Sequence, residues 1–311
     1  MLFRSFLLTI SLSPLFFGTN RPWSWSLYAV ILACIGLLYF VNALMKREGF
    51  DIAIQPIKYP LALVLLPLIW AFIQASSWVP LSWAHPFWTL AAQQLPIIVT
   101  PGISLSPAET MTALMKLMSY LLVFFLSFQF SRYSDKASLT FNTLAYVGAA
   151  YAMYGLYAFW GNDNVLLGFD NSAYEGNVRS TFVNRNSYAT YAGLSLLALF
   201  PLLLERVRGS LVYGINSYYG LQYFIENFII RAWIPLLMGV IIFTALFLSH
   251  SRGGGLSSTL AVLVFFMTLF LAGKLRKGKA LLIFLLTLSI MGVSFWSSGD
   301  RLLERMDEIS L

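Results

Sequence analysis

The chain has 311 residues, a formal net charge of +7 and a charged fraction of 11%, against about 25% in an average soluble domain. Hydrophobic residues make up 59% of the sequence, and a water-soluble protein of this composition would expose large apolar patches. The composition therefore excludes an ordinary cytosolic enzyme, a disordered chain and a secreted scaffold held by disulfides. It predicts a membrane protein that crosses the bilayer several times.

A helix needs about 20 apolar residues to cross the hydrocarbon core, because it rises about 1.5 Å per residue and the core is about 30 Å thick. The apolar stretches between charges are too long for strands and do not alternate, and helices satisfy their own backbone amides in lipid. We therefore predict an all-α fold, a polytopic transmembrane bundle of about nine spans that forms a single membrane domain over 1–311. The predicted spans are 3–18, 24–45, 60–75, 108–130, 138–160, 186–204, 232–250, 255–273 and 280–297. The first is expected to be an uncleaved helix, since no clear signal-peptide cleavage site follows it.

Two apolar stretches are not assigned as spans. Residues 76–106 contain several prolines, glutamines and tryptophans, which indicates an interfacial or re-entrant segment at the outer face. The helix that follows has its own start signal in Ser106, Pro107 and Glu109, at the N-cap, N1 and N3 positions. Residues 205–231 mix tyrosines with aliphatic residues and are predicted to form a cytoplasmic surface helix.

The distribution of Lys and Arg predicts a cytoplasmic N-terminus. With alternating spans, 13 basic residues then fall on the inside, as the positive-inside rule requires: Arg4, Lys46, Arg47, Lys58, Arg132, Lys136, Arg206, Arg208, Arg231, Lys274, Arg276, Lys277 and Lys279. Six fall on the outside, and all are arginines: Arg21, Arg179, Arg185, Arg252, Arg301 and Arg305. This bias accounts for the net positive charge without nucleic-acid binding. Arginine holds phosphate through a planar fork that lysine lacks, so an all-arginine outer face hints at an anionic ligand.

The outer connection 161–185 leads directly into a predicted span. Arg179 and Arg185 flank the sequence STFVN, and the amides that open the next helix carry the positive end of its dipole. This pattern fits an anion site open to the outer face. The alternative is a solvated loop whose arginines lie at lipid headgroups.

A second outer turn contains Ser251, Arg252 and three glycines, Gly253 to Gly255. Glycines allow the backbone to approach a partner closely, so the turn is a second candidate for anion binding. The alternative is a tight turn with an interfacial arginine. The neighbouring His250 is more simply explained as a polar cap than as an acid or base.

Residues 300–311 carry a charged pattern in which Arg301 and Arg305 lie one helical turn apart. We expect either an amphipathic surface helix or the start of an outer, periplasmic loop that is cut off. Lys116 lies inside a predicted span, where it either reaches the membrane surface or faces a polar cavity. No metal-ligand cluster, nucleotide-binding loop or Ser/His/Asp set occurs, so the sequence predicts no metal and no cofactor.

Residues 179–189 (RSTFVNRNSYA) at the start of one span, with Ser251-Arg252-Gly253-Gly254 between the next two, resemble the O-antigen ligase and polymerase family of bacterial inner-membrane proteins. The start of the fourth helix at 106–110 is also similar. The resemblance implies transfer of a glycan from undecaprenyl diphosphate to an acceptor at the outer face of the inner membrane. It implies lipid A-core as acceptor for a ligase and a second lipid-linked glycan for a polymerase, with the lipid bilayer as environment and no nucleotide or metal.

The resemblance also suggests roles for individual residues. Negative charge builds on the diphosphate as the sugar leaves, and arginines stabilise such charge in a low-dielectric site. Arg179, Arg185 and Arg252 are the candidates for that catalytic role. The candidates for substrate binding are Asn184, Asn186, Ser251, Gly253, Arg301 and Arg305. The acceptor also needs a base, and the family's usual candidate is a histidine in a large periplasmic loop, which would begin here near Asp300.

A competing hypothesis is a transporter or flippase for an anionic solute or a lipid-linked glycan. It uses Lys116 and the prolines as features of a cavity, and predicts charges near mid-membrane on several helices. Only Lys116 meets that condition in the sequence.

Overall fold

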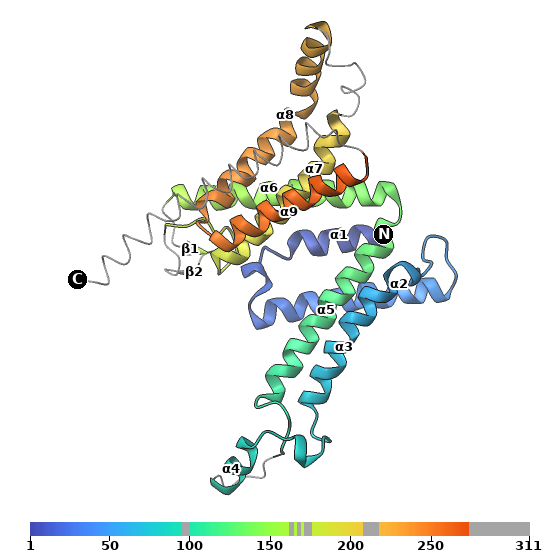
Figure 1. Cartoon of the computed structure of the whole chain (residues 1–311), viewed down its shortest axis with the longest axis vertical. Coiled ribbons are helices and arrows are strands. Elements are labelled where there is room, and N and C mark those ends of the chain that lie inside the picture. The colour runs from blue at the N-terminus through green and yellow to red at the C-terminus, as the bar shows by residue number, and fades with distance from the viewer. Residues whose placement is uncertain (95–99, 162–164, 167–168, 171–175, 208–217, 274–311) are drawn as a thin grey trace, which may run out of the picture. The chain divides into compact units, whose positions relative to one another are not determined.

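In the computed structural model, residues 1–94, 100–161, 165–166, 169–170, 176–207 and 218–273 are described. These residues are helical apart from short connections and one antiparallel pair of two-residue strands, β1 (Val165–Leu166) and β2 (Phe169–Asp170). Figure 1 shows the order of the elements along the chain. The predicted all-helical fold class is confirmed at this level.

Six helical segments in the described part are long and apolar enough to cross a membrane, as expected of a polytopic membrane protein. They correspond to six of the predicted spans and begin or end within a few residues of them. The helices are α2 (Pro22–Leu44), α3 (Lys58–Ala75) with the preceding turn η2 (Gln55–Ile57), α5 (Pro107–Ser131), α7 (Arg185–Val207), α8 (Tyr218–Leu248) and α9 (Arg252–Leu271).

The predicted helix 3–18 is wrong in length. Helix α1 (Leu2–Leu12) has 11 residues, or about 16 Å, and does not reach across a hydrocarbon core of about 30 Å. Pro14 follows, and a proline cannot continue the helix because it lacks an amide hydrogen. The chain then forms the short turn η1 (Phe17–Thr19), in which all three residues have positive φ.

Helix α6 (Ser134–Trp160) includes the predicted span 138–160 but is not among the six apolar segments. Four tyrosines and an asparagine lower its mean hydropathy, so its assignment as a span remains a prediction. The ninth predicted span, 280–297, and the charged segment 300–311 with Arg301 and Arg305 lie outside the described residues.

The separate surface helix predicted over 205–231 is wrong for the residues that are described. Helix α7 continues to Val207, and α8 runs without interruption from Tyr218 through the predicted span to Leu248. No proline occurs between Tyr218 and Pro235, so nothing separates a surface helix from the span. Residues 208–217 lie outside the described part.

The chain divides into two compact units where the sequence predicts a single domain. The first comprises Met1–Thr9 and Pro22–Tyr133, and the second comprises Ile10–Arg21 and the residues from Ser134 onward. Hydropathy alone gives no sign of this boundary, because apolar spans occur on both sides of it.

In the first unit, α5 packs against α2 and α3. The predicted interfacial stretch contains only the short helices η3 (Leu81–Trp83) and α4 (Phe87–Gln94) in its described residues, and Trp78 and Trp83 are exposed. Helix α5 begins at Pro107 as predicted, but its N-cap Ser106 makes no capping hydrogen bond through its side chain. The Ser104 hydroxyl instead accepts a hydrogen bond from the Ser106 amide at 3.1 Å.

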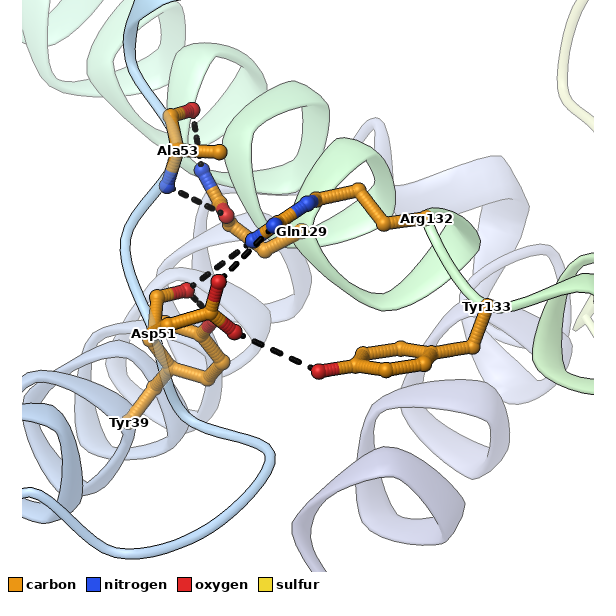
Figure 2. Close-up of polar contacts among 6 residues, drawn as sticks. All are labelled: Tyr39, Asp51, Ala53, Gln129, Arg132 and Tyr133. Carbon is orange, nitrogen blue, oxygen red and sulfur yellow. Dashed lines mark hydrogen bonds and ion pairs between the residues drawn. The ribbon is translucent and has the colours of Figure 1, made fainter.

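The end of α5 holds the loop that joins α2 to α3 (Figure 2). Gln129 is 1% exposed, and its amide pairs with both backbone groups of Ala53: Nε2 donates to the carbonyl oxygen at 3.0 Å, and Oε1 accepts from the backbone amide at 3.1 Å. The side-chain amide therefore pairs with the backbone of Ala53 as the backbone of a neighbouring strand would, and its buried polar atoms are hydrogen-bonded.

Asp51 in the same loop forms an ion pair with Arg132, with 2.8 Å between Oδ2 and Nη2 (Figure 2). The Tyr133 hydroxyl donates to Asp51 Oδ1 at 3.3 Å, and the Tyr39 hydroxyl donates to the Asp51 carbonyl oxygen at 3.0 Å. The hydrogen bond from Arg132 is the main cause that lowers the pKa of the Asp51 carboxyl. The charged form of Asp51 is therefore the one that fixes this loop.

We expect acid to weaken this contact. A lowered pKa in the folded protein means that the ion pair contributes stability above the unfolded-state pKa of about 3.9 and loses it as pH falls through the folded-state value. Thermal unfolding of the detergent-solubilised protein at decreasing pH should show this loss in the wild type and not in Asp51→Asn. The control is Asp135→Asn, which removes a carboxylate bonded to the Ser134 hydroxyl rather than to an arginine. Equal acid dependence of the wild type and Asp51→Asn would contradict the assignment.

In the second unit, α7 packs against α6, α8 and α9. Its closest approaches to α6 and α9 are made at small residues, which let helix backbones approach closely in membrane proteins. Gly148 of α6 lies against Ser195, and Gly193 lies against Ser258 of α9. Near the start of α9, Gly254 lies against Ala189.

The contacts between α7 and α9 keep a constant register. Asn186 pairs with Ser251, Ala189 with Gly254 and Gly193 with Ser258, and each pair is separated by 65 positions. A constant positive offset means that the two helices run parallel. Both helices therefore start at the same end of the second unit, as predicted for two spans separated by one other.

The glycine triplet provides a test of this packing. A Cβ at Gly254 would overlap Ala189, whereas nothing lies within 4 Å of a Cβ built at Gly253 or Gly255. Gly254→Ala should therefore lower the free energy of unfolding by about 1–3 kcal/mol through overpacking. Gly253→Ala and Gly255→Ala should leave it unchanged or raise it by up to about 1 kcal/mol, because alanine favours the helix. Unfolding in detergent measures all three, and equal effects at the three positions would refute the predicted α7–α9 contact.

Candidate functional site

The segment 177–182 before α7 is buried, although the sequence suggests a polar outer loop. Asn177, Val178, Arg179, Ser180 and Thr181 are each less than 9% exposed. Irregular backbone is tolerated at membrane depth only where protein or a water-filled cavity surrounds it. The segment therefore belongs to the interior of the second unit.

Hydroxyl groups satisfy the backbone around this segment. The Ser180 hydroxyl donates to the Tyr151 carbonyl oxygen of α6 at 2.7 Å, and the Thr181 hydroxyl donates to the Pro14 carbonyl oxygen at 2.6 Å. The Tyr151 hydroxyl donates to the Ser11 carbonyl oxygen at 3.1 Å. Side chains from α6 and from the buried segment thus bond to the chain around Ser11 and Pro14, where the Pro14 carbonyl oxygen also accepts from the Gly18 amide at 3.1 Å.

Helix α7 begins with a side-chain cap. Asn184 immediately precedes the helix, and its Oδ1 accepts a hydrogen bond from the Asn186 amide at 2.7 Å. This is the bond that an N-cap asparagine makes with the first turn. Asn184 thus has an intramolecular role as well as the substrate-binding role predicted for it.

Helix α9 begins with a second cap, which also joins it to α7. Ser251 is the N-cap, and its hydroxyl accepts from the Gly254 amide at 3.1 Å. The same hydroxyl donates to Asn186 Oδ1 at 2.8 Å. This hydrogen bond connects the two sequence motifs proposed to form the site.

The three candidate arginines each lie one residue from a contact between these elements. Arg179 follows Val178, whose amide donates to the Leu248 carbonyl oxygen at the end of α8 at 3.0 Å. Arg185 precedes Asn186, and Arg252 follows Ser251. The structure therefore brings their backbone positions to the same end of the second unit.

The surroundings of the three side chains differ. Arg179 is 8% exposed, so its charge lies inside the protein. Arg185 is half-buried, and its Nη1 donates to Asn177 Oδ1 at 2.8 Å, which directs it back towards the buried segment. Arg252, the first residue of α9, is exposed. The three arginines thus share one end of the second unit in sequence position but differ in burial.

The electrostatic character of this end follows from the parallel helices. Each helix carries about half a positive charge at its N-terminus, and two parallel helices place those charges close together. The arginines add full positive charges, of which only that of Arg179 belongs to a buried residue. Such an arrangement is suited to an anion that reaches several backbone amides and guanidinium groups together.

The structure also places Gly253, His250 and Lys116, the other residues that the sequence analysis considered. Gly253 is exposed and has open space around it, and it is Gly254 that makes the close approach to α7. His250 is half-buried with φ of 49°, at the turn between α8 and α9. Lys116, on which the transporter hypothesis depended, lies with its ammonium over the Trp25 ring, 5.2 Å from its centroid. This cation–π contact stabilises the Lys116 ammonium in part.

Sequence reasoning missed Tyr151, Ser180 and Thr181, whose hydroxyls hold the buried segment. Their residue types are also common in solvated loops, so no local signal distinguishes the two cases. Among the described residues, no group of three His, Cys, Asp or Glu side chains is placed to hold a metal ion.

Comparison with known proteins gives no relative on which to base a function. No family model, curated protein or solved structure matches the chain.

Proposed function

We propose that the second unit binds the diphosphate of a lipid-linked glycan and assists transfer of that glycan to an acceptor. The donor class is an undecaprenyl-diphosphate-linked glycan. The acceptor is a lipid A-core or a second lipid-linked glycan, and the reaction takes place at the outer face of a bacterial inner membrane. The resemblance of residues 179–189 and 251–254 to O-antigen ligases and polymerases suggests this chemistry, and the geometry of the two helix starts supports it.

The observation that carries the proposal is the hydrogen bond between the Ser251 hydroxyl and Asn186 Oδ1. It joins two motifs that lie 65 positions apart and brings Arg185 and Arg252 to neighbouring helix starts. A site assembled in this way can hold two phosphate groups from different sides. An interfacial arginine that only contacts lipid headgroups does not need such a link.

The chemistry places the largest demand on anion stabilisation. As the bond between the sugar and the phosphate breaks, its electron pair goes to the diphosphate oxygen. Arg179, Arg185 and Arg252 would stabilise that charge, since electrostatic stabilisation is most effective in a low-dielectric site that is already organised. Asn184, Asn186 and Ser251 would act as positioning residues that hold the two helix starts. The base that accepts the proton of the acceptor hydroxyl is not assigned to a described residue.

The test replaces each arginine in cells that depend on this gene for surface glycan. Each Arg→Ala variant should reduce transfer by about 100-fold, as removal of one donor from such a site does. Each Arg→Lys variant should also reduce transfer, because lysine keeps the charge but lacks the planar fork. Glycan length and the accumulation of lipid-linked precursor measure the outcome.

Two controls separate function from folding. The amount of protein in the membrane shows whether a variant folds, which matters most for the buried Arg179. Arg21→Ala and Arg21→Lys remove an exposed arginine from the same predicted side of the membrane, and should leave transfer unchanged. Normal glycan in every variant of Arg179, Arg185 and Arg252 would refute the proposal.

A further inference from the structure

The hydroxyl group of Tyr188 is buried without a protein partner. The residue is 1% exposed, and its hydroxyl makes no hydrogen bond with any described residue. A buried hydroxyl normally finds a partner, because leaving it unpaired costs free energy. Such exceptions in a folded protein often mark the position of a ligand or a water molecule.

Another tyrosine hydroxyl in this part of the second unit, that of Tyr151, shows the usual behaviour. Tyr151 donates to the Ser11 carbonyl oxygen at 3.1 Å. The Ser180, Thr181 and Ser251 hydroxyls are also bonded. The fold therefore satisfies the hydroxyls around Tyr188 and leaves this one unsatisfied.

Tyr188 lies in the first turn of α7, at the candidate site. Its amide donates to the Asn184 carbonyl oxygen at 3.1 Å, and its ring centroid lies 5.8 Å from that of Phe182. Long side chains on a helix point towards its N-terminus. Phe182 belongs to the segment that precedes the helix, so the Tyr188 ring packs against the buried segment that carries Arg179.

We infer that the Tyr188 hydroxyl is a substrate-binding group that donates a hydrogen bond to a phosphate oxygen of the bound diphosphate. This inference rests on the proposed function. A phenol can either donate or accept a hydrogen bond. The positive ends of α7 and α9 favour an anionic oxygen near the first turn of α7, and towards such an oxygen the phenol is the donor.

The variant Tyr188→Phe tests this because it removes only the hydroxyl. No hydrogen bond with a described residue is lost, so thermal stability without ligand should be unchanged or higher. The affinity of the purified full chain in detergent for undecaprenyl diphosphate should fall by about 10-fold or more, as expected for loss of a hydrogen bond to a charged group. Titrations with radiolabelled undecaprenyl diphosphate measure the affinity, and unfolding without ligand measures the stability.

Two further tyrosines serve as controls. Tyr151→Phe removes a hydroxyl with a protein partner, so it should lower stability. Tyr157→Phe removes a hydroxyl from a residue that is 71% exposed, and should change neither stability nor affinity.

The outcomes separate this inference from the proposed function. If Arg185→Lys weakens binding while Tyr188→Phe binds like the wild type, the hydroxyl holds only water and the inference is wrong. A loss of stability in Tyr188→Phe would reveal a protein partner and also overturn it. If the wild type does not bind undecaprenyl diphosphate, both the proposed function and the inference fail. The same titrations are made with phosphatidylglycerol. If Tyr188→Phe weakens binding of phosphatidylglycerol but not of undecaprenyl diphosphate, the diphosphate assignment is overturned.

Discussion

The close, parallel contact between α7 and α9 determines the arrangement of the second unit. Small residues at 189, 193, 254 and 258 bring the two helices together, and the Ser251–Asn186 hydrogen bond fixes their starting points. Two helix dipoles that point the same way at short range repel each other unless negative charge lies at their common positive end. The contact therefore produces a positive potential at this end of the unit, which an anion would lower.

The buried segment before α7 is the second consequence of this packing. Hydroxyls from α6 and from the buried segment donate to the carbonyl oxygens of Ser11, at the end of α1, and of Pro14, just after it. These hydrogen bonds hold the irregular segment in place. Arg179 therefore lies inside the protein rather than among lipid headgroups. Arg179 is thus a buried cation of the second unit, whereas Arg252 at the start of α9 is exposed.

The sequence predicts most of the helices because membrane spans are a local property of composition. The absence of charge over about 20 residues is sufficient to locate α2, α3, α5, α7, α8 and α9. The errors in helix length occur where the apolar composition of a stretch and its helix-ending or polar residues predict different boundaries. Pro14 ends α1 inside an apolar stretch, and the polar residues of 218–231 continue the helix of the adjacent span.

The candidate site is less predictable, since its contacts are long-range. The residue types and motifs identify Arg185, Asn186, Ser251 and Arg252 as neighbours in a possible site, but composition does not reveal the 65-position register between α7 and α9. The burial of Arg179 is equally hidden, because the hydrogen bonds that draw its segment inward come from Tyr151 and from the residues after α1. The contacts of Gln129 with Ala53 and of Asp51 with Tyr133 were missed for the same reason, since the residues of each pair are more than 70 positions apart.

Cross-linking of residues 186 and 251 tests the central contact most directly. The chain would carry Asn186→Cys and Ser251→Cys together, with Cys34→Ala to remove the natural thiol, and would be oxidised in native membranes. Mass spectrometry should then find a disulfide or a short bis-thiol cross-link between the two positions. A pair made from Asn186→Cys and Leu260→Cys, about two and a half turns further along α9, should not react. Absence of the 186–251 cross-link in folded protein, or equal reaction of the control pair, would contradict the joined helix starts on which the account depends.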